Sequence, residues 1–334
     1  MTKPAHKKAF LAATLTALSL GASAVHAENN VNIKLAYAQN SQPVKDALAK
    51  FGSLVEEKSG GSISVTYFPD SQLGGESELV ELLQTGAIDM TKVSGGLMGS
   101  FSPLYSVFSM PYLFDGEKHF HDVMSNPDIM NDVYQSTKDQ GFVGVGWYDS
   151  GQRNFYTTDE PIHEVSDLEG KKIRVMQSEK AVNTMKLLGA SPVVMSQEEV
   201  YTALQQGILD GAENNEFALT AARHGEVVNY YTLDGHTRIP DIILFNSNTL
   251  SSLTDPQREA VMSAIDESIQ FQLEQWSQSV EEARKSIKDD FNVEINEVDI
   301  SPFQDAVQPM YDDLKSHPEQ YSLYQKIKNT SSNQ

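Results

Sequence analysis

The chain has 334 residues, with 25 Lys and Arg against 46 Asp and Glu, which gives a formal net charge of −21. Such an acidic chain excludes nucleic acid as a partner, because phosphate binding needs a basic surface, and it disfavours adhesion to anionic lipid. The sequence contains no cysteine, which excludes disulfides, thiolate metal sites and cysteine nucleophiles.

The first 27 residues predict a signal peptide. Lys3, Lys7 and Lys8 precede an apolar stretch from Ala9 to Ala24, and small residues lead to Ala27, after which we expect cleavage. The apolar stretch of about 16 residues is shorter than the roughly 20 that a spanning helix needs. The leader holds three Lys and no acid, so residues 28–334 carry 22 basic against 46 acidic side chains, a net charge of −24. We therefore expect an exported, periplasmic protein.

Strand-like and helical segments alternate along the rest of the chain. Helical spacing predicts a helix around Val44 to Val55 that Ser59 ends, a second that Gly86 stops, and a third that opens with Ser196 and Glu199 as a capping box. Alternating strands and helices indicate α/β layers with mostly parallel sheet. The predicted strands are 31–38, 63–68, 142–148, 172–176 and 192–195.

Two segments of the chain resemble each other. Residues 83–89, LQTGAID, match residues 204–210, LQQGILD, and each reads as a helix end, a glycine stop and a strand start. The repeat predicts two similar lobes, each of which feeds a strand toward a shared cleft, since ligands of open α/β sheets lie beyond the carboxyl ends of strands.

A long amphipathic segment begins at Thr254. Apolar residues recur at helical spacing from Val261 to Ile287, which predicts a helix of about 35 residues and about 50 Å. Such a helix either pairs with another chain as a coiled coil or lies across both lobes, and we favour the second interpretation, with a monomeric protein.

No motif for catalysis, metal or nucleotide binding is present, so we expect no enzymatic activity, no metal and no cofactor. Two arginines remain as candidates. Arg174 lies within the otherwise apolar strand 172–176, where a guanidinium is costly unless it meets an anion, and Arg153 follows a predicted lobe crossing at residues 149–152. A guanidinium binds a carboxylate through two parallel hydrogen bonds. The residues alone leave open that both arginines form ordinary salt bridges with the many acids.

Six segments in order resemble the periplasmic solute receptors of tripartite ATP-independent periplasmic (TRAP) transporters. These are FPDSQLGG (68–75), MPYLF (110–114), DLEGKKIRV (167–175), LGASP (188–192), EVYTALQQG (199–207) and DGAEN (210–214). The resemblance implies the two-lobe α/β fold of periplasmic binding proteins, with crossing strands and a long C-terminal helix spanning both lobes. It implies one lobe from residues 28–150 with 240–279 and the other from 151–239 with 280–334.

The resemblance also implies a carboxylate ligand in the cleft and delivery to a membrane permease. Arg174 matches the family's central arginine, Arg153 its second arginine, and Asn214 the asparagine that binds the same carboxylate. Further polar neighbours of the ligand are expected at Glu76, Asn215, Asp241, His236, Gln197 and Ser94.

Departures from the common pattern favour a sugar acid. Gln152 precedes the second arginine where many relatives have an aromatic residue, and Asn215 stands where many have proline. These residues look more like the branch that takes glucuronate and galacturonate, and we see no third Arg or Lys placed to bind a dicarboxylate. The alternatives are a receptor for a C4-dicarboxylate or other small carboxylate, an exported lyase or hydrolase of acidic sugars, and a structural protein that dimerises through its long helix.

Overall fold

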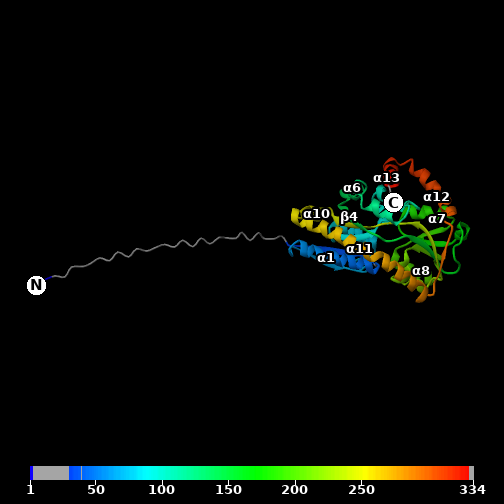
Figure 1. Ribbon diagram of the computed structural model, residues 1–334, viewed down its shortest axis with the longest axis horizontal. Coiled ribbons are helices and arrows are strands. Elements are labelled where there is room, and N and C mark those ends of the chain that lie inside the picture. Colours follow the sequence, from blue (N-terminus) through cyan, green and yellow to red (C-terminus); the bar gives the residue numbers. More distant parts are fainter. Residues whose placement is uncertain (3–29, 39, 331–334) are drawn as a thin grey trace.

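The computed structural model describes residues 1–2, 30–38 and 40–330 and shows two β-sheets, each covered by helices (Figure 1). The expected signal peptide falls almost entirely outside the described residues. Within the described ranges, no helix is long and apolar enough to cross a membrane. The two sheets and their helices are called the first and the second lobe below.

The sheet of the first lobe has the strand order β2-β1-β3-β10-β4. The strands β1, β2 and β3 are parallel, whereas β10 runs antiparallel to both β3 and β4. The bounds of its strands are β1 (Val31–Tyr37), β2 (Ile63–Phe68), β3 (Met90–Ser94), β4 (Phe142–Tyr148) and β10 (Asp241–Asn246). The helices of this part of the chain are α1 (Gln42–Lys58), α2 (Glu76–Thr85), α3 (Gly95–Met98), α4 (Pro103–Ser106), α5 (Glu117–Met124), α6 (Pro127–Gln135) and α10 (Ser247–Ser252), with 3-10 turns at Val107–Ser109 and Lys138–Gln140.

The sheet of the second lobe has the order β11-β9-β5-β8-β6-β7. Here β6, β7 and β8 are parallel and β5 runs antiparallel to β8 and β9. Its strands are β5 (Arg153–Thr157), β6 (Lys172–Val175), β7 (Ser191–Val194), β8 (Gly211–Asn214), β9 (Tyr230–Thr237) and β11 (Glu294–Glu297). The helices are α7 (Glu179–Leu187), α8 (Gln197–Gln205), α9 (Glu216–Thr220) and α12 (Ser301–Leu314), with 3-10 turns at Val165–Leu168 and His224–Glu226.

The two sheets repeat one arrangement, as the internal repeat predicted. In each, three parallel strands are followed by an antiparallel strand that enters from the other lobe, β10 after β9 and β5 after β4. Each crossing strand runs against its neighbours, whereas the other four strands of the first sheet and the other five of the second share one direction. The prediction of mostly parallel sheet is therefore confirmed, with one antiparallel strand in each sheet. The crossing segments 149–152 and 238–240 lie side by side, and Ser150 Oγ donates a hydrogen bond of 2.5 Å to the carbonyl of Ile239.

The helix α11 (Asp255–Asp289) confirms the predicted long helix across both lobes (Figure 1). Thr254 and Gln257 cap its start reciprocally. It packs against α1 and β4 of the first lobe and against α9 of the second. Gln272, in its middle, accepts a hydrogen bond from the amide of Asp149 and donates one to that residue's carbonyl, which fixes the crossing segment to the helix.

The C-terminal helices depart from the expected lobe boundaries. The first half of α12 packs on α7 of the second lobe through Phe303 and Val307. The helix α13 (Pro318–Asn329) returns to the first lobe, where Leu323 and Ile327 join the hydrophobic core. Residues 280–334 therefore do not all belong to the second lobe, because the chain crosses back to the first lobe a second time.

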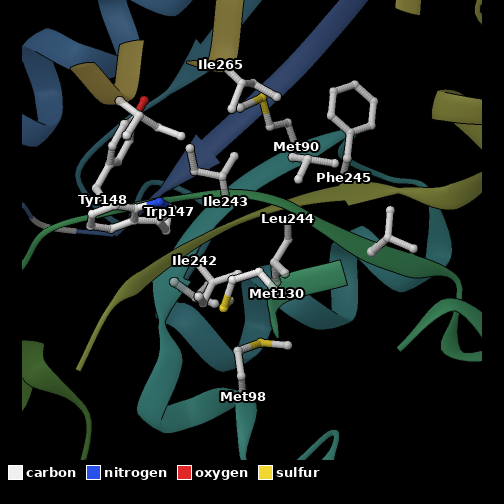
Figure 2. Close-up of a cluster of buried hydrophobic side chains, with 14 of the residues drawn as sticks. Met90, Met98, Met130, Trp147, Tyr148, Ile242, Ile243, Leu244, Phe245 and Ile265 are labelled. Atoms are coloured by element: carbon white, nitrogen blue, oxygen red, sulfur yellow. The ribbon is translucent and has the colours of Figure 1, made fainter. Parts of the chain in front are cut away.

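The core of the first lobe lies on both faces of β10 (Figure 2). Ile242 and Leu244 point toward Met98 and Met130, while Ile243 points to the opposite face, toward α11. This alternation is the period of two of a strand. A strand buried on both faces cannot shift its register without placing polar atoms in the core, so β10 holds Asp241, its first residue, in a fixed position between the lobes.

Candidate functional site

A cavity of about 150 Å³ lies between the two lobes and is lined by residues of both. The carboxyl ends of β3, β6 and β8 reach it, as do the crossing segment 149–152, the start of β10 and α11. The expected site residues on its wall are Glu76, Ser94, Arg153, Arg174, Gln197, Asn214, Asn215 and Asp241. Residues far apart in the sequence are thus brought together by the paired lobes.

Arg174, on β6, is buried, with 3% of its surface exposed, and lines the cavity. Its Nε and Nη2 donate to the carbonyl of Met195 at 3.0 and 2.8 Å, and its Nη1 donates to Gln197 Oε1 at 3.0 Å. Among the described residues no carboxylate pairs with it, and burial lowers its pKa. A guanidinium has five N–H donors, so one N–H on each Nη stays free for a ligand.

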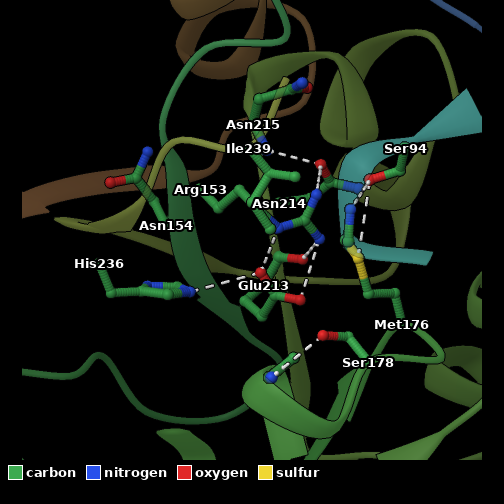
Figure 3. Close-up of polar contacts among 12 residues, drawn as sticks. Ser94, Arg153, Asn154, Met176, Ser178, Glu213, Asn214, Asn215, His236 and Ile239 are labelled. Carbon is green, nitrogen blue, oxygen red and sulfur yellow. Dashed lines mark hydrogen bonds and ion pairs between the residues drawn. The ribbon is translucent and has the colours of Figure 1, made fainter. Parts of the chain in front are cut away.

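Arg153, the first residue of β5, by contrast forms an ion pair with a buried carboxylate (Figure 3). Its Nε and Nη2 donate to the two carboxylate oxygens of Glu213, and Nη1 donates to Asn214 Oδ1 at 2.9 Å. Burial opposes ionisation of Glu213, but Arg153 and His236 lower the pKa of this carboxyl to about 2. The charge of Arg153 is therefore compensated, and one N–H on its Nη1 remains for a ligand.

His236 lies behind Glu213 and does not line the cavity, so the prediction that it is a direct neighbour of the ligand is not supported by the geometry. Its Nε2 lies 3.3 Å from Glu213 Oε2 and its Nδ1 lies 2.8 Å from Asp234 Oδ2. Burial acts against protonation, but the two carboxylates raise the pKa of His236 to about 9. His236 thus supports Glu213, and through it Arg153.

The amide side chains of the site differ in how many of their hydrogen bonds are already made. Gln197 Oε1 accepts from Arg174 and, at 3.4 Å, from Asn214 Nδ2. Asn215 donates from Nδ2 to the carbonyl of Ser150 at 2.7 Å and caps α9 with Oδ1. Asn214 Oδ1 accepts from Arg153 and from the amide of Asn215, so Asn214 keeps one N–H for a ligand. Asn215 keeps one donor and one acceptor.

Sequence reasoning missed a third cation in the cavity, Lys92 of β3. This residue is 3% exposed, and its Nζ lies 2.9 Å from Asp241 Oδ2 and 3.4 Å from Glu76 Oε1. Burial acts to lower the pKa of Lys92, but the two carboxyl groups raise it above its usual value. A third basic residue therefore lies in the cavity, but two acidic groups pair with it, so it is not a free cation for a second carboxylate. Lys92, Asp241 and Glu76 are together called the Lys92 cluster below.

Residues 36–317 match the family model described as bacterial extracellular solute-binding protein, family 7. The chain belongs to this family. It is 61% identical to the uncharacterized protein YiiZ of Salmonella typhimurium over 94% of this chain and 96% of that protein. A TRAP periplasmic solute-binding protein of Anaerococcus prevotii, solved with bound D-glucuronate, is 37% identical with a TM-score of 0.87, over 90% of this chain and 98% of that one. Another, of Sulfitobacter, solved with β-D-galacturonate, is 32% identical with a TM-score of 0.84, over 89% and 99% of the two chains.

These matches confirm the resemblance inferred from the six sequence segments, and the protein is a TRAP-type solute-binding protein. The fold that the resemblance implied, two α/β lobes with crossing strands and a long helix, is confirmed as well.

The solute-binding protein has an aromatic wall that sequence reasoning also missed. Trp276 of α11 is 3% exposed and lines the cavity with Phe217, the two ring centroids being 5.0 Å apart. The helical spacing had placed Trp276 on the apolar face of α11, but this spacing does not show where along the helix the cavity lies. An apolar ring face of this kind suits the carbon side of a sugar ring.

Direct contacts join the two lobes at the edge of the cavity. Ser71 Oγ of the first lobe donates to Glu198 Oε1 at 2.8 Å, and Ser77 Oγ donates to Gln177 Oε1 at 3.1 Å. Ser94 Oγ also lies 3.7 Å from the sulfur of Met176. The two lobes are thus in direct contact at the edge of the cavity.

Proposed function

We propose that the protein is the periplasmic receptor of a TRAP transporter, which binds a hexuronate such as D-glucuronate or D-galacturonate and delivers it to the membrane permease. The buried, uncompensated guanidinium of Arg174 carries the proposal, because its two free N–H groups at the wall of the cavity call for a carboxylate. Asn214 adds a neutral amide to the site, and Arg153 adds a guanidinium whose charge Glu213 compensates.

The rest of the cavity supports a sugar acid. A hexuronate has one carboxylate and several hydroxyl groups, and hydroxyls need both donors and acceptors around them. The cavity offers an aromatic wall, amides and the Lys92 cluster. The family members from Anaerococcus prevotii and Sulfitobacter, solved with hexuronates, share this fold at over 30% identity, which favours the same class of ligand.

Isothermal titration calorimetry of the purified protein tests the proposal, with D-glucuronate, D-galacturonate and succinate as ligands. We expect one site per chain for a hexuronate and much weaker binding of succinate. Saturable binding of succinate without binding of either hexuronate would instead assign the protein to the dicarboxylate receptors. Release of a product from the hexuronate would assign it to the alternative class of lyases and hydrolases.

A further inference from the structure

The first lobe contributes the Lys92 cluster to the cavity. Unlike the arginines of the second lobe, this cluster presents both acidic and basic groups. In the Lys92 cluster, Asp241 comes directly after a crossing segment and is 6% exposed, while Glu76 begins α2. Both oxygens of Glu76 accept a hydrogen bond from the amide of Ser94, at 3.1 and 3.0 Å. Glu76 and Asp241 therefore hold the ammonium of Lys92 from two sides.

In the Lys92 cluster one ammonium stands against two carboxyl groups, so the acidic groups outnumber the basic one. Arg174, from the second lobe, is the opposite case, because no described acid compensates it. The cavity is therefore polarised, with an anion site on one lobe and a neutral or anionic wall on the other.

The hydrogen bonds left over in the Lys92 cluster match a hydroxyl group. Lys92 has three N–H donors and spends two on Asp241 and Glu76, which leaves one. Among the described residues Asp241 Oδ1 accepts no hydrogen bond, whereas its Oδ2 accepts from Lys92. One free donor next to one free acceptor suits a group that both accepts and donates. A carboxylate only accepts, and the nearby carboxyl groups repel it.

We infer that the Lys92 cluster is the specificity filter of the site: it binds hydroxyl groups at the end of the ligand remote from Arg174 and rejects acids that carry a second carboxylate there. The inference rests on the proposed function, whose carboxylate site is Arg174. It predicts that sugar monoacids bind and that the corresponding diacids are excluded.

The ratio of dissociation constants for D-glucarate and D-glucuronate tests this inference. D-Glucarate carries a carboxylate at C1, where D-glucuronate carries an aldehyde or its hemiacetal, and calorimetry with wild type and Asp241→Asn gives the ratio for each protein. Removal of one carboxylate from the cluster is expected to lower the ratio by about tenfold or more, because a like charge within a few ångströms is removed. The preference of each ligand for ring or open chain is the same for both proteins and cancels.

Two further variants make the outcome unambiguous. Glu76→Gln removes the other carboxyl group of the cluster and should shift the ratio in the same direction, which covers the case that Asp241→Asn fails to fold. Asp122→Asn, whose carboxylate pairs with Lys118 at the surface, removes the same charge outside the cavity and should leave the ratio unchanged. An unchanged ratio in both cluster variants, with hexuronate binding intact in wild type, overturns the filter alone. Absence of hexuronate binding in wild type overturns the proposed function and the filter with it.

Discussion

Replacement of Arg174 by Met should abolish ligand binding while the unliganded protein stays folded. Methionine is similar in length, unbranched and uncharged. The two N–H groups that Arg174 keeps free would each form a hydrogen bond to a carboxylate, worth about 1.5–3 kcal/mol. Loss of both amounts to about 3–6 kcal/mol, which raises the dissociation constant by about 10² to 10⁴.

The same substitution has a small effect on stability for a reason specific to this residue. Arg174→Met loses three hydrogen bonds from a charged donor, to Met195 and Gln197, each worth about 1.5–3 kcal/mol. It also removes a buried guanidinium that no described acid compensates, and burial of such a charge costs several kcal/mol. The two effects oppose each other, so the melting temperature without ligand should stay close to that of wild type or rise.

Thermal unfolding with and without D-glucuronate, together with calorimetry, checks both expectations. Wild type should gain melting temperature with ligand, since the ligand binds only the folded state, and Arg174→Met should gain none at the same concentration. Binding of the variant at wild-type affinity would refute the assignment of the carboxylate site. A large loss of stability without ligand would instead show that Arg174 has a structural partner.

Three further predictions concern the surroundings of Arg174. Arg153→Met should destabilise the unliganded protein by about 3–5 kcal/mol in denaturant unfolding, because it leaves the carboxylate of Glu213 buried without its guanidinium; a neutral result would contradict this pairing. His236, whose pKa is raised to about 9, stabilises the fold fully below its unfolded value of 6.5 and loses this contribution as pH rises through 9. Wild type should therefore lose more stability between pH 6.5 and 9 than His236→Gln, and equal slopes would count against the assignment. Glu198→Ala removes the interlobe bond to Ser71 and should weaken ligand binding by about two- to tenfold, with unchanged melting of the free protein.

Local periodicity predicted the elements that local chemistry determines. The strands 63–68 and 142–148 lie where expected, since β-branched and aromatic runs between turn residues leave few alternatives. The capping box at Ser196 was visible because both partners lie within one turn, and the start of the long helix was placed at Thr254. The antiparallel crossing strands were not visible, because strand direction depends on pairing with distant segments. The return of α13 to the first lobe has the same cause, since its apolar face fits either core equally well in sequence.

The residues of the candidate site likewise separate into those that the sequence could reveal and those that only the fold brings together. Arg174 was found because a charge within an apolar strand is unusual in sequence, but its functional meaning depends on having no acid beside it. With 46 acids in the chain, the sequence could not show that Arg153 is paired and Arg174 is not. Lys92 was overlooked for the converse reason: its partners lie 16 and 149 residues away, and only the sheet brings them to it. Charge compensation, rather than the presence of charged residues, therefore separates the residue expected to hold the carboxylate from those expected to shape the rest of the cavity.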